Sequence, residues 1–112
     1  MPNEQRTVLI TGAAGYIGSA LVEALSDDKR FRVVAVDLRE TPKENLRAGV
    51  VYETADVRGR SMASLIAMHQ PVTVVHLAAI VAPGMHSRAF EYAVDVEGTR
   101  NVLDACVGTG VH

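Results

Sequence analysis

Three glycines spaced three residues apart, between an apolar run and a helical pattern, constrain this chain more than any other feature. Thr7–Ile10 is β-branched and apolar, Gly12, Gly15 and Gly18 follow it, and Ser19–Leu25 then has helical spacing. This order predicts a strand, a tight loop and a helix. The first glycine lets the chain turn off the strand, the second lets a ligand approach the backbone, and the third lets the helix pack closely on the sheet.

The start of such a helix is suited to a negatively charged group. Its unpaired amides and its dipole stabilise an anion without a lysine, which is typical of a site for the pyrophosphate of a dinucleotide. No Gly-Lys-Ser/Thr follows the glycines, so a phosphate-transferring P-loop is disfavoured. An ordinary strand-to-helix turn remains the alternative for the loop taken alone.

A carboxylate stands where a dinucleotide site needs one. Asp37 ends the apolar run Phe31–Val36 and lies 19 residues beyond Gly18, the spacing at which a carboxylate binds the ribose hydroxyls. Its charge would repel a 2′-phosphate, which favours NAD over NADP, although Arg39 is near enough to weaken that preference. We expect Asp37 and Leu38 at the adenosine ribose, and the alternative is that Asp37 only caps the end of its strand.

The rest of the chain alternates between strand and helix patterns. We predict strands over Phe31–Val36, Val50–Thr54 and Val72–Leu77. Helices are predicted over Ser61–His69 and over Ser87–Gly108, with Ser87 as N-cap. The segments Ala78–His86 and Leu38–Gly49 are predicted to be loops, the second with one helical turn near Glu44–Arg47. The nearly continuous apolar run of Val72–Leu77 fits a strand covered on both faces. The alternation predicts an α/β fold, a parallel sheet with right-handed crossovers and helices on both faces.

Composition and charge exclude several classes of protein. The chain has 112 residues, of which 48% are hydrophobic and 21% charged, as in one globular domain, and its net charge of −2 does not favour nucleic acid or an anionic membrane. It has no apolar run long enough to span a membrane and no hydrophobic signal core, so we expect a cytoplasmic protein. The lone Cys106 cannot form an internal disulfide, and no ligand spacing indicates a metal site.

Four segments together resemble the extended short-chain dehydrogenase/reductase family, in particular its NAD-dependent epimerase/dehydratase group, over nearly the whole chain. Thr11–Gly18 has the family spacing Thr-Gly-x-x-Gly-x-x-Gly. Asp56-Val57 is similar to the pair whose carboxylate meets the adenine amino group, and residues 76–79, His-Leu-Ala-Ala, are similar to a segment that lies along the cofactor. Val94–Leu103 resembles the family helix Asn-Val-x-Gly-Thr-x-Asn-Leu/Val-Leu, with Asp95 in place of the first Asn.

The resemblance implies a Rossmann-type doubly wound parallel sheet with strands in the order 3-2-1-4. It also implies a site for NAD, with NADP less favoured, made largely by main-chain groups. We expect Gly12, Gly15, Tyr16, Ile17 and Gly18 at the pyrophosphate, Asp37 and Leu38 with the neighbouring Arg39 at the adenosine ribose, Asp56 and Val57 at the adenine, and Leu77, Ala78 and Ala79 toward the nicotinamide ribose. The resemblance implies a structural role for His76. It also implies that the helix over Ser87–Gly108 helps to form a homodimer.

The acid/base pair of the family, Tyr-x-x-x-Lys, does not occur in the 112 residues. We therefore predict no catalytic residue and expect residues 1–112 to be a truncated NAD(P)-binding Rossmann domain whose catalytic and substrate part is absent. The complete protein is then expected to be an epimerase, dehydratase or dehydrogenase that acts by hydride transfer on a sugar nucleotide or a similar hydroxylated small molecule.

Two other interpretations stay open at this point. A non-catalytic dinucleotide-sensing or interaction module would keep the glycine loop and lack the Tyr-x-x-x-Lys pair. Alternatively, the chain binds nothing tightly, because a dinucleotide spans both halves of such a fold and half a site provides little affinity.

Overall fold

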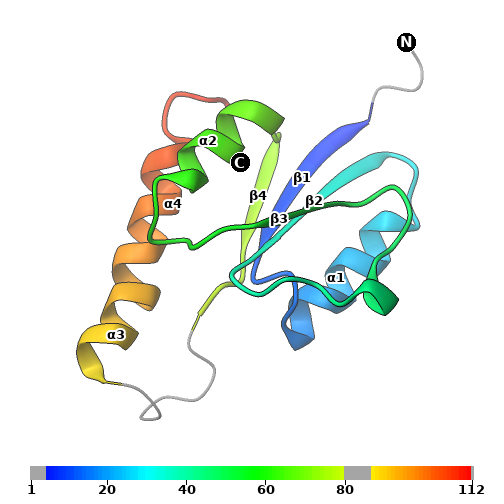
Figure 1. Ribbon diagram of the computed structural model, residues 1–112. Helices are drawn as coiled ribbons and strands as arrows, with labels where there is room; N and C mark the ends of the chain where they lie inside the picture. Colours follow the sequence, from blue (N-terminus) through cyan, green and yellow to red (C-terminus); the bar gives the residue numbers. More distant parts are fainter. Residues whose placement is uncertain (1–4, 80–86, 112) are drawn as a thin grey trace.

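Four parallel strands form a single sheet in the part of the chain that the structure, a computed structural model, describes, residues 5–79 and 87–111. The strands are β1 (Arg6–Thr11), β2 (Phe31–Asp37), β3 (Val51–Thr54) and β4 (Thr73–His76). They lie in the order β3-β2-β1-β4 and every pair is parallel, which confirms the predicted Rossmann-type arrangement (Figure 1).

Helices lie on both faces of this sheet, as predicted (Figure 1). They are α1 (Tyr16–Ser26), the 3₁₀ turn η1 (Lys43–Asn45), α2 (Ser61–His69), α3 (Arg88–Tyr92), the π-helical segment η2 (Ala93–Gly98) and α4 (Thr99–Cys106). Helix α1 packs on one face, and α2 and α4 pack on the other. Helix α1 begins three residues before the predicted Ser19, because Gly15 is already its N-cap.

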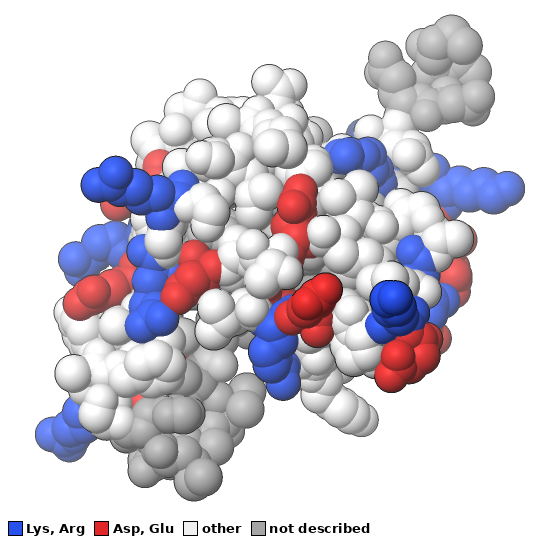
Figure 2. Space-filling view, in the orientation of Figure 1, with Lys and Arg blue, Asp and Glu red and all other residues white. Residues whose placement is uncertain are grey.

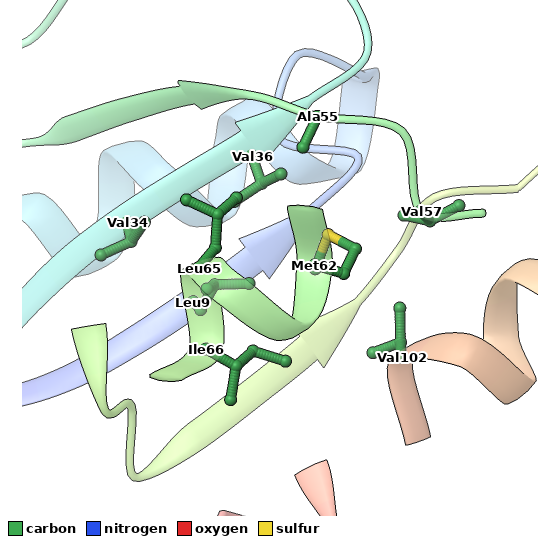
Figure 3. Close-up of a cluster of buried hydrophobic side chains, with 9 residues drawn as sticks. All are labelled: Leu9, Val34, Val36, Ala55, Val57, Met62, Leu65, Ile66 and Val102. Carbon is green, nitrogen blue, oxygen red and sulfur yellow. The ribbon is translucent and has the colours of Figure 1, made fainter. Parts of the chain in front are cut away.

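The main core lies between the sheet and the pair α2 and α4. It is formed by side chains that β1 and β2 direct to this face, by two residues that follow β3, and by the inner faces of the two helices (Figure 3): Leu9, Val34, Val36, Ala55, Val57, Met62, Leu65, Ile66 and Val102. A strand directs alternate side chains to opposite faces, so the intervening strand residues Val8, Ile10, Val33 and Ala35 form the second core. Ala13 of the glycine loop and Val22 of α1 complete it. The alternation explains why the buried middle of both central strands, residues 8–10 and 33–36, is continuously apolar.

Strand β4 differs from its prediction. Its four residues are only half-buried, whereas the last four residues of β1 are fully buried. Within the described residues β4 pairs with β1 alone and is an edge of the sheet, so its residues stay partly exposed although Val74 packs against the core on one face and Val75 against the core on the other. It is also shorter than the predicted Val72–Leu77.

The predicted helix over Ser87–Gly108 is helical from Arg88 to Cys106, but it is not a uniform α-helix. Its middle, η2, is π-helical, and the Thr99 hydroxyl donates to the carbonyl of Asp95 at 2.7 Å, a side-chain bond of the kind that disturbs the regular ladder. Ser87 caps the start as predicted, since its Oγ accepts from the Phe90 amide at 3.1 Å. The helix ends before Gly108, whose φ is +79°.

The burial of the main core predicts a clear difference between two Leu→Ala changes. Leu9 is 0% exposed at the centre of β1, so Leu9→Ala should lower the free energy of unfolding by about 2–5 kcal/mol. Leu38 is 61% exposed, so Leu38→Ala should change it by less than about 0.5 kcal/mol. Urea unfolding without ligand measures both, and equal losses would contradict the assignment of the core.

Candidate functional site

A cleft of about 740 Å³ opens at the carboxyl ends of the strands, where open α/β sheets bind their ligands. It brings together predicted site residues from the glycine loop, the end of β2, the turn after β3 and the segment after β4. They are Gly12, Gly15, Tyr16, Asp37, Leu38, Arg39, Asp56, Val57, Leu77, Ala78 and Ala79. Ile17 and Gly18 do not line it. Sequence reasoning missed six residues that do: Ala14, Val36, Ala55, Arg58, Phe90 and Val94.

The first and third glycines are required by close packing of backbone on backbone. Gly12 has a φ of +69°, and a Cβ there would lie 2.7 Å from the amide nitrogen of Ala78. A Cβ on Gly18 would overlap the carbonyl oxygen of Gly12. Any side chain at either position would therefore push the start of α1 away from the end of the sheet.

The start of α1 presents amides rather than side chains. Its N-cap, Gly15, makes no side-chain cap bond, and the first turn holds no acidic residue. The first amide to bond to Gly15 is that of Ser19, at 2.9 Å, so the amides of Tyr16, Ile17 and Gly18 precede the helical ladder. These amides and the helix dipole favour an anion at this position. Ile17 and Gly18 can thus contribute main-chain amides although they do not line the cleft.

Asp37 connects the end of β2 to the glycine loop. Its side chain is 12% exposed, Oδ2 accepts from the Ala14 amide at 2.9 Å, and Oδ1 accepts from the Arg39 amide at 2.9 Å. Asp37 therefore caps the end of its strand, as the alternative interpretation expected, through these two backbone amides. A carboxylate has about four lone-pair positions, so two acceptor positions remain for a donor in the cleft, such as a ribose hydroxyl.

The turn after β3 places a second carboxylate in the cleft, but this one already has a strong partner. Asp56 accepts from the amide and the side chain of Arg58, with an Oδ2–Nη2 distance of 2.6 Å. This bonding by the Arg58 guanidinium holds the pKa of the Asp56 carboxyl below its ordinary value. The Arg58 guanidinium also lies over the ring of Phe90, 5.2 Å from the centroid.

His76 links the sheet to the last helices through a directional series of hydrogen bonds. The buried Thr11 hydroxyl accepts from the amides of Leu77 and Ala78 at 3.1 and 3.2 Å, so its own hydrogen is donated to His76 Nδ1 at 2.7 Å. Nε2 then carries the ring proton and donates to Thr99 Oγ1 at 3.0 Å. This arrangement needs a neutral ring, and burial lowers the pKa of His76 from its ordinary value of 6.5.

Helix α4 and the end of η2 also hold the turn after β3. Asn101 Nδ2 donates to the carbonyls of Val57 and Gly59 at 2.7 and 2.8 Å. Gly98 allows this approach, because a Cβ there would lie 2.8 Å from a methyl carbon of Val57. Sequence reasoning gave these positions no role of their own. The signal was the pattern Gly-Thr-x-Asn, in which Gly98 and Asn101 contact the turn after β3 and Thr99 bonds to His76.

Within the described residues, neither the distribution of charged side chains nor the placement of possible metal ligands indicates a second site. Acidic and basic side chains are interspersed on the face shown in Figure 2. Over residues 5–79 and 87–111, no three His, Cys, Asp or Glu side chains are grouped to hold a metal ion. Within the same ranges, every helix is too short or too polar to cross a bilayer.

Comparison with known proteins finds a matching family over most of the chain. Residues 8–112 match the family described as the NAD dependent epimerase/dehydratase family. Over 119 residues the chain is 34% identical to the 3beta-hydroxysteroid-dehydrogenase/decarboxylase isoform 2 of Arabidopsis thaliana, a match that covers 96% of this chain and 21% of that protein. It is 33% identical over 110 residues to the UDP-glucose 4-epimerase of Mycolicibacterium smegmatis, covering 92% of this chain and 35% of that one.

Among solved structures, the UDP-glucose 4-epimerase of Thermus thermophilus, a complex with NAD, is 32% identical and superposes with a TM-score of 0.82. The superposition covers 95% of this chain and 35% of that one. The chain therefore spans between 21% and 35% of the length of these three relatives.

The neutral His76 predicts a pH dependence of stability. Burial depresses the pKa of His76 in the folded protein below its ordinary value of 6.5. The contribution of the neutral ring to the free energy of unfolding is therefore fully present above pH 6.5, and it is lost as the pH falls through the lower pKa of the folded state. Urea unfolding at about pH 7.5 and about pH 5.5 should show lower stability at the lower pH. His76→Gln, an amide that can still accept and donate, should reduce that difference. An unchanged difference in this variant would show that His76 does not cause it.

Proposed function

We propose, from the premise that this chain belongs to the NAD-dependent epimerase/dehydratase family, that its cleft binds the NAD of a hydride-transferring oxidoreductase. The observation that carries the proposal is the juxtaposition of two complementary groups at the carboxyl end of the sheet. The uncapped start of α1 offers amides to a pyrophosphate, and the neighbouring Asp37 offers acceptors to a ribose diol.

The residues present fit a dinucleotide in shape as well as in charge. Gly12 and Gly18 allow the start of α1 to pack against the end of the sheet beside the cleft, and a volume of about 740 Å³ lies within the usual range for small-molecule sites. The expected contacts are Gly12, Gly15, Tyr16, Ile17 and Gly18 at the pyrophosphate, Asp37, Leu38 and Arg39 at the adenosine ribose, Asp56 and Val57 at the adenine, and Leu77, Ala78 and Ala79 toward the nicotinamide ribose.

Bound NAD would supply a hydride acceptor to the site. The chain's own residues would orient the cofactor: the α1 amides hold its negative centre, Asp37 fixes one ribose, and the backbone after β4 lies along the remaining length of the cleft. The Thr11–His76 hydrogen bond secures that backbone, since the same hydroxyl accepts from Leu77 and Ala78.

The proposed substrate of the complete protein is a sugar nucleotide or a similar hydroxylated small molecule. Two of the similar proteins are UDP-glucose 4-epimerases and another is a 3beta-hydroxysteroid-dehydrogenase/decarboxylase, so a hydroxylated ring carbon is the feature their named substrates share. The 112 residues contain no Tyr-x-x-x-Lys pair. This part of the protein is therefore proposed to hold the cofactor, without a residue assigned to the proton transfer of the substrate.

The role of Asp37 predicts the choice between the two nicotinamide cofactors. Asp37→Ala removes the acceptors for the ribose hydroxyls and the charge that repels a 2′-phosphate. Its affinity for NAD should fall about tenfold or more, and the ratio of NAD to NADP affinity should fall toward one. Calorimetric titration of both cofactors measures the ratio, with the thermal midpoint of each variant as the control for folding. An unchanged ratio would show that Asp37 does not contact the ribose.

We also propose that the protein forms a homodimer through its last helices. The stripe proposed as the interface consists of the exposed apolar residues Tyr92, Val96 and Leu103 of these helices and of Val107, which directly follows α4. The resemblance of Val94–Leu103 to the dimer-forming helix of the family supports the same surface. Burying this stripe against a second copy would remove its apolar side chains from water.

Charge introduced into this stripe should prevent dimerisation. Leu103→Arg places a cation on the exposed face of α4 and should shift the chain to a monomer at micromolar concentration, as measured by sedimentation equilibrium. Met68→Arg, on an exposed apolar residue of α2, is the matched control and should leave the dimer intact. A wild-type monomer, or dimers of both variants, would contradict the assignment of this surface.

A further inference from the structure

One hydroxyl at the start of α4 connects two walls of the cleft. Thr99 Oγ1 accepts from His76 Nε2 at 3.0 Å and donates to the carbonyl of Asp95 at 2.7 Å. The Thr99 side chain does not itself line the cleft. His76, however, directly precedes the cleft-lining segment after β4, and Asp95 directly follows Val94, which lines the cleft from η2.

The first wall, the segment after β4, depends on the direction of a series of hydrogen bonds. At one end the amides of residues 77–78, which can only donate, bond to the Thr11 hydroxyl. At the other end the Asp95 carbonyl can only accept, so it takes the single hydrogen of the Thr99 hydroxyl. Thr99 must then accept from His76 Nε2, which leaves Nδ1 to accept from Thr11 at 2.7 Å. The Thr99 hydroxyl therefore helps to hold the one tautomer of His76 that fits the bonds to this wall.

The second wall is η2, and the same hydroxyl maintains its π-helical form. In a regular α-helix the Thr99 amide would donate to the carbonyl of Asp95, four residues earlier. Here the amide donates to the carbonyl of Val96, and the hydroxyl donates to Asp95 instead. A π-helical turn contains more residues than an α-helical turn, so it rotates the residues before it relative to α4. The bond from Thr99 thus stabilises the rotation that places Val94 in the wall of the cleft.

We propose that Thr99 is a positioning residue for the dinucleotide, because its hydroxyl holds the segment after β4 through His76 and Val94 through the Asp95 carbonyl. This inference rests on the proposed function, since it concerns the same cleft. Walls that are held in place before binding lose less conformational freedom when the ligand enters. Loss of the Thr99 hydroxyl should consequently lower the affinity for NAD in a protein that still folds.

The test is a calorimetric titration of NAD into the full 112-residue chain and its variants. Thr99→Val has the shape of threonine and lacks the hydroxyl, so the affinity for NAD should fall about tenfold or more. Thr99→Ser keeps the hydroxyl and should bind within about threefold of the wild type. Thr109→Val is the matched control and should leave the affinity unchanged. The exposed Thr109 hydroxyl also donates to a helix carbonyl, that of Cys106 at 2.6 Å, but Thr109 lies outside the cleft.

A second readout follows the connection through His76, which a general loss of stability would not affect selectively. In the wild type at about pH 7.5, the ring ¹⁵N resonances of His76 should show a proton on Nε2 and none on Nδ1. Without NAD, Thr99→Val should shift the amide resonances of Leu77 and Ala78, and Thr99→Ser should keep them near their wild-type positions.

The outcomes separate this inference from the function on which it rests. If the folded wild type does not bind NAD, the proposed function fails and this inference fails with it. The positioning role of Thr99 alone is overturned, and the proposed function stands, in any of three cases. These are a folded Thr99→Val that binds NAD as tightly as the wild type, a Thr99→Ser that loses as much affinity as Thr99→Val, and a wild-type His76 with its ring proton on Nδ1.

Should Thr99→Val not fold by circular dichroism, Thr99→Ala provides the same test. It removes the same hydroxyl and introduces the residue with the highest helix propensity. Its affinity for NAD should likewise fall about tenfold or more, and an unchanged affinity would overturn the inference.

Discussion

Contact of backbone with backbone at Gly12 is the constraint on which the rest of the structure depends. Gly12 lies against the chain that follows β4 on one side and against Gly18 in the first turn of α1 on the other, with no room for a Cβ at either glycine. This packing brings the start of α1 to the carboxyl end of the sheet. The uncapped amides, the Asp37 carboxylate and the Leu77–Ala79 segment consequently face one cleft.

Buried polar side chains then connect the two sides of the cleft. The Thr11 hydroxyl binds the backbone after β4 and, through His76, the Thr99 hydroxyl at the start of α4. Asn101, further along the same helix, holds the turn after β3. The hydrogen bonds from Thr11 through His76 to Thr99 run in one direction, which favours a single arrangement of the last helices on the sheet.

Much of the fold could be predicted from the sequence because local patterns and global topology agree. Apolar runs ended by Asp37 or followed by glycines mark strands, and parallel strands need helical crossovers, so the order β3-β2-β1-β4 follows from the family pattern. The π-helical segment was not predicted, because the Thr99 bond to the Asp95 carbonyl depends on local geometry that hydrophobic periodicity does not encode. The partial exposure of β4 was not predicted, because the burial of a strand depends on which elements lie beside it and not on its own sequence.

The candidate site was predictable where a residue type has one common use. Glycine spacing and the carboxylate at the end of β2 indicate a dinucleotide site from sequence alone. Arg58 and Phe90 were missed because an arginine in a turn and a phenylalanine in a helix have many uses, and only their contact in the wall of one cleft gives them a shared one.

The most direct test of the account is a titration of the ¹⁵N-labelled chain with NAD, followed by the shifts of its amide resonances. If the start of α1 binds the pyrophosphate, the largest changes will occur at the amides of Tyr16, Ile17 and Gly18, with further changes at Asp37 and along Leu77–Ala79. Saturating NAD that leaves the Tyr16–Gly18 amides unmoved would contradict the account, whatever shifts occur elsewhere in the chain.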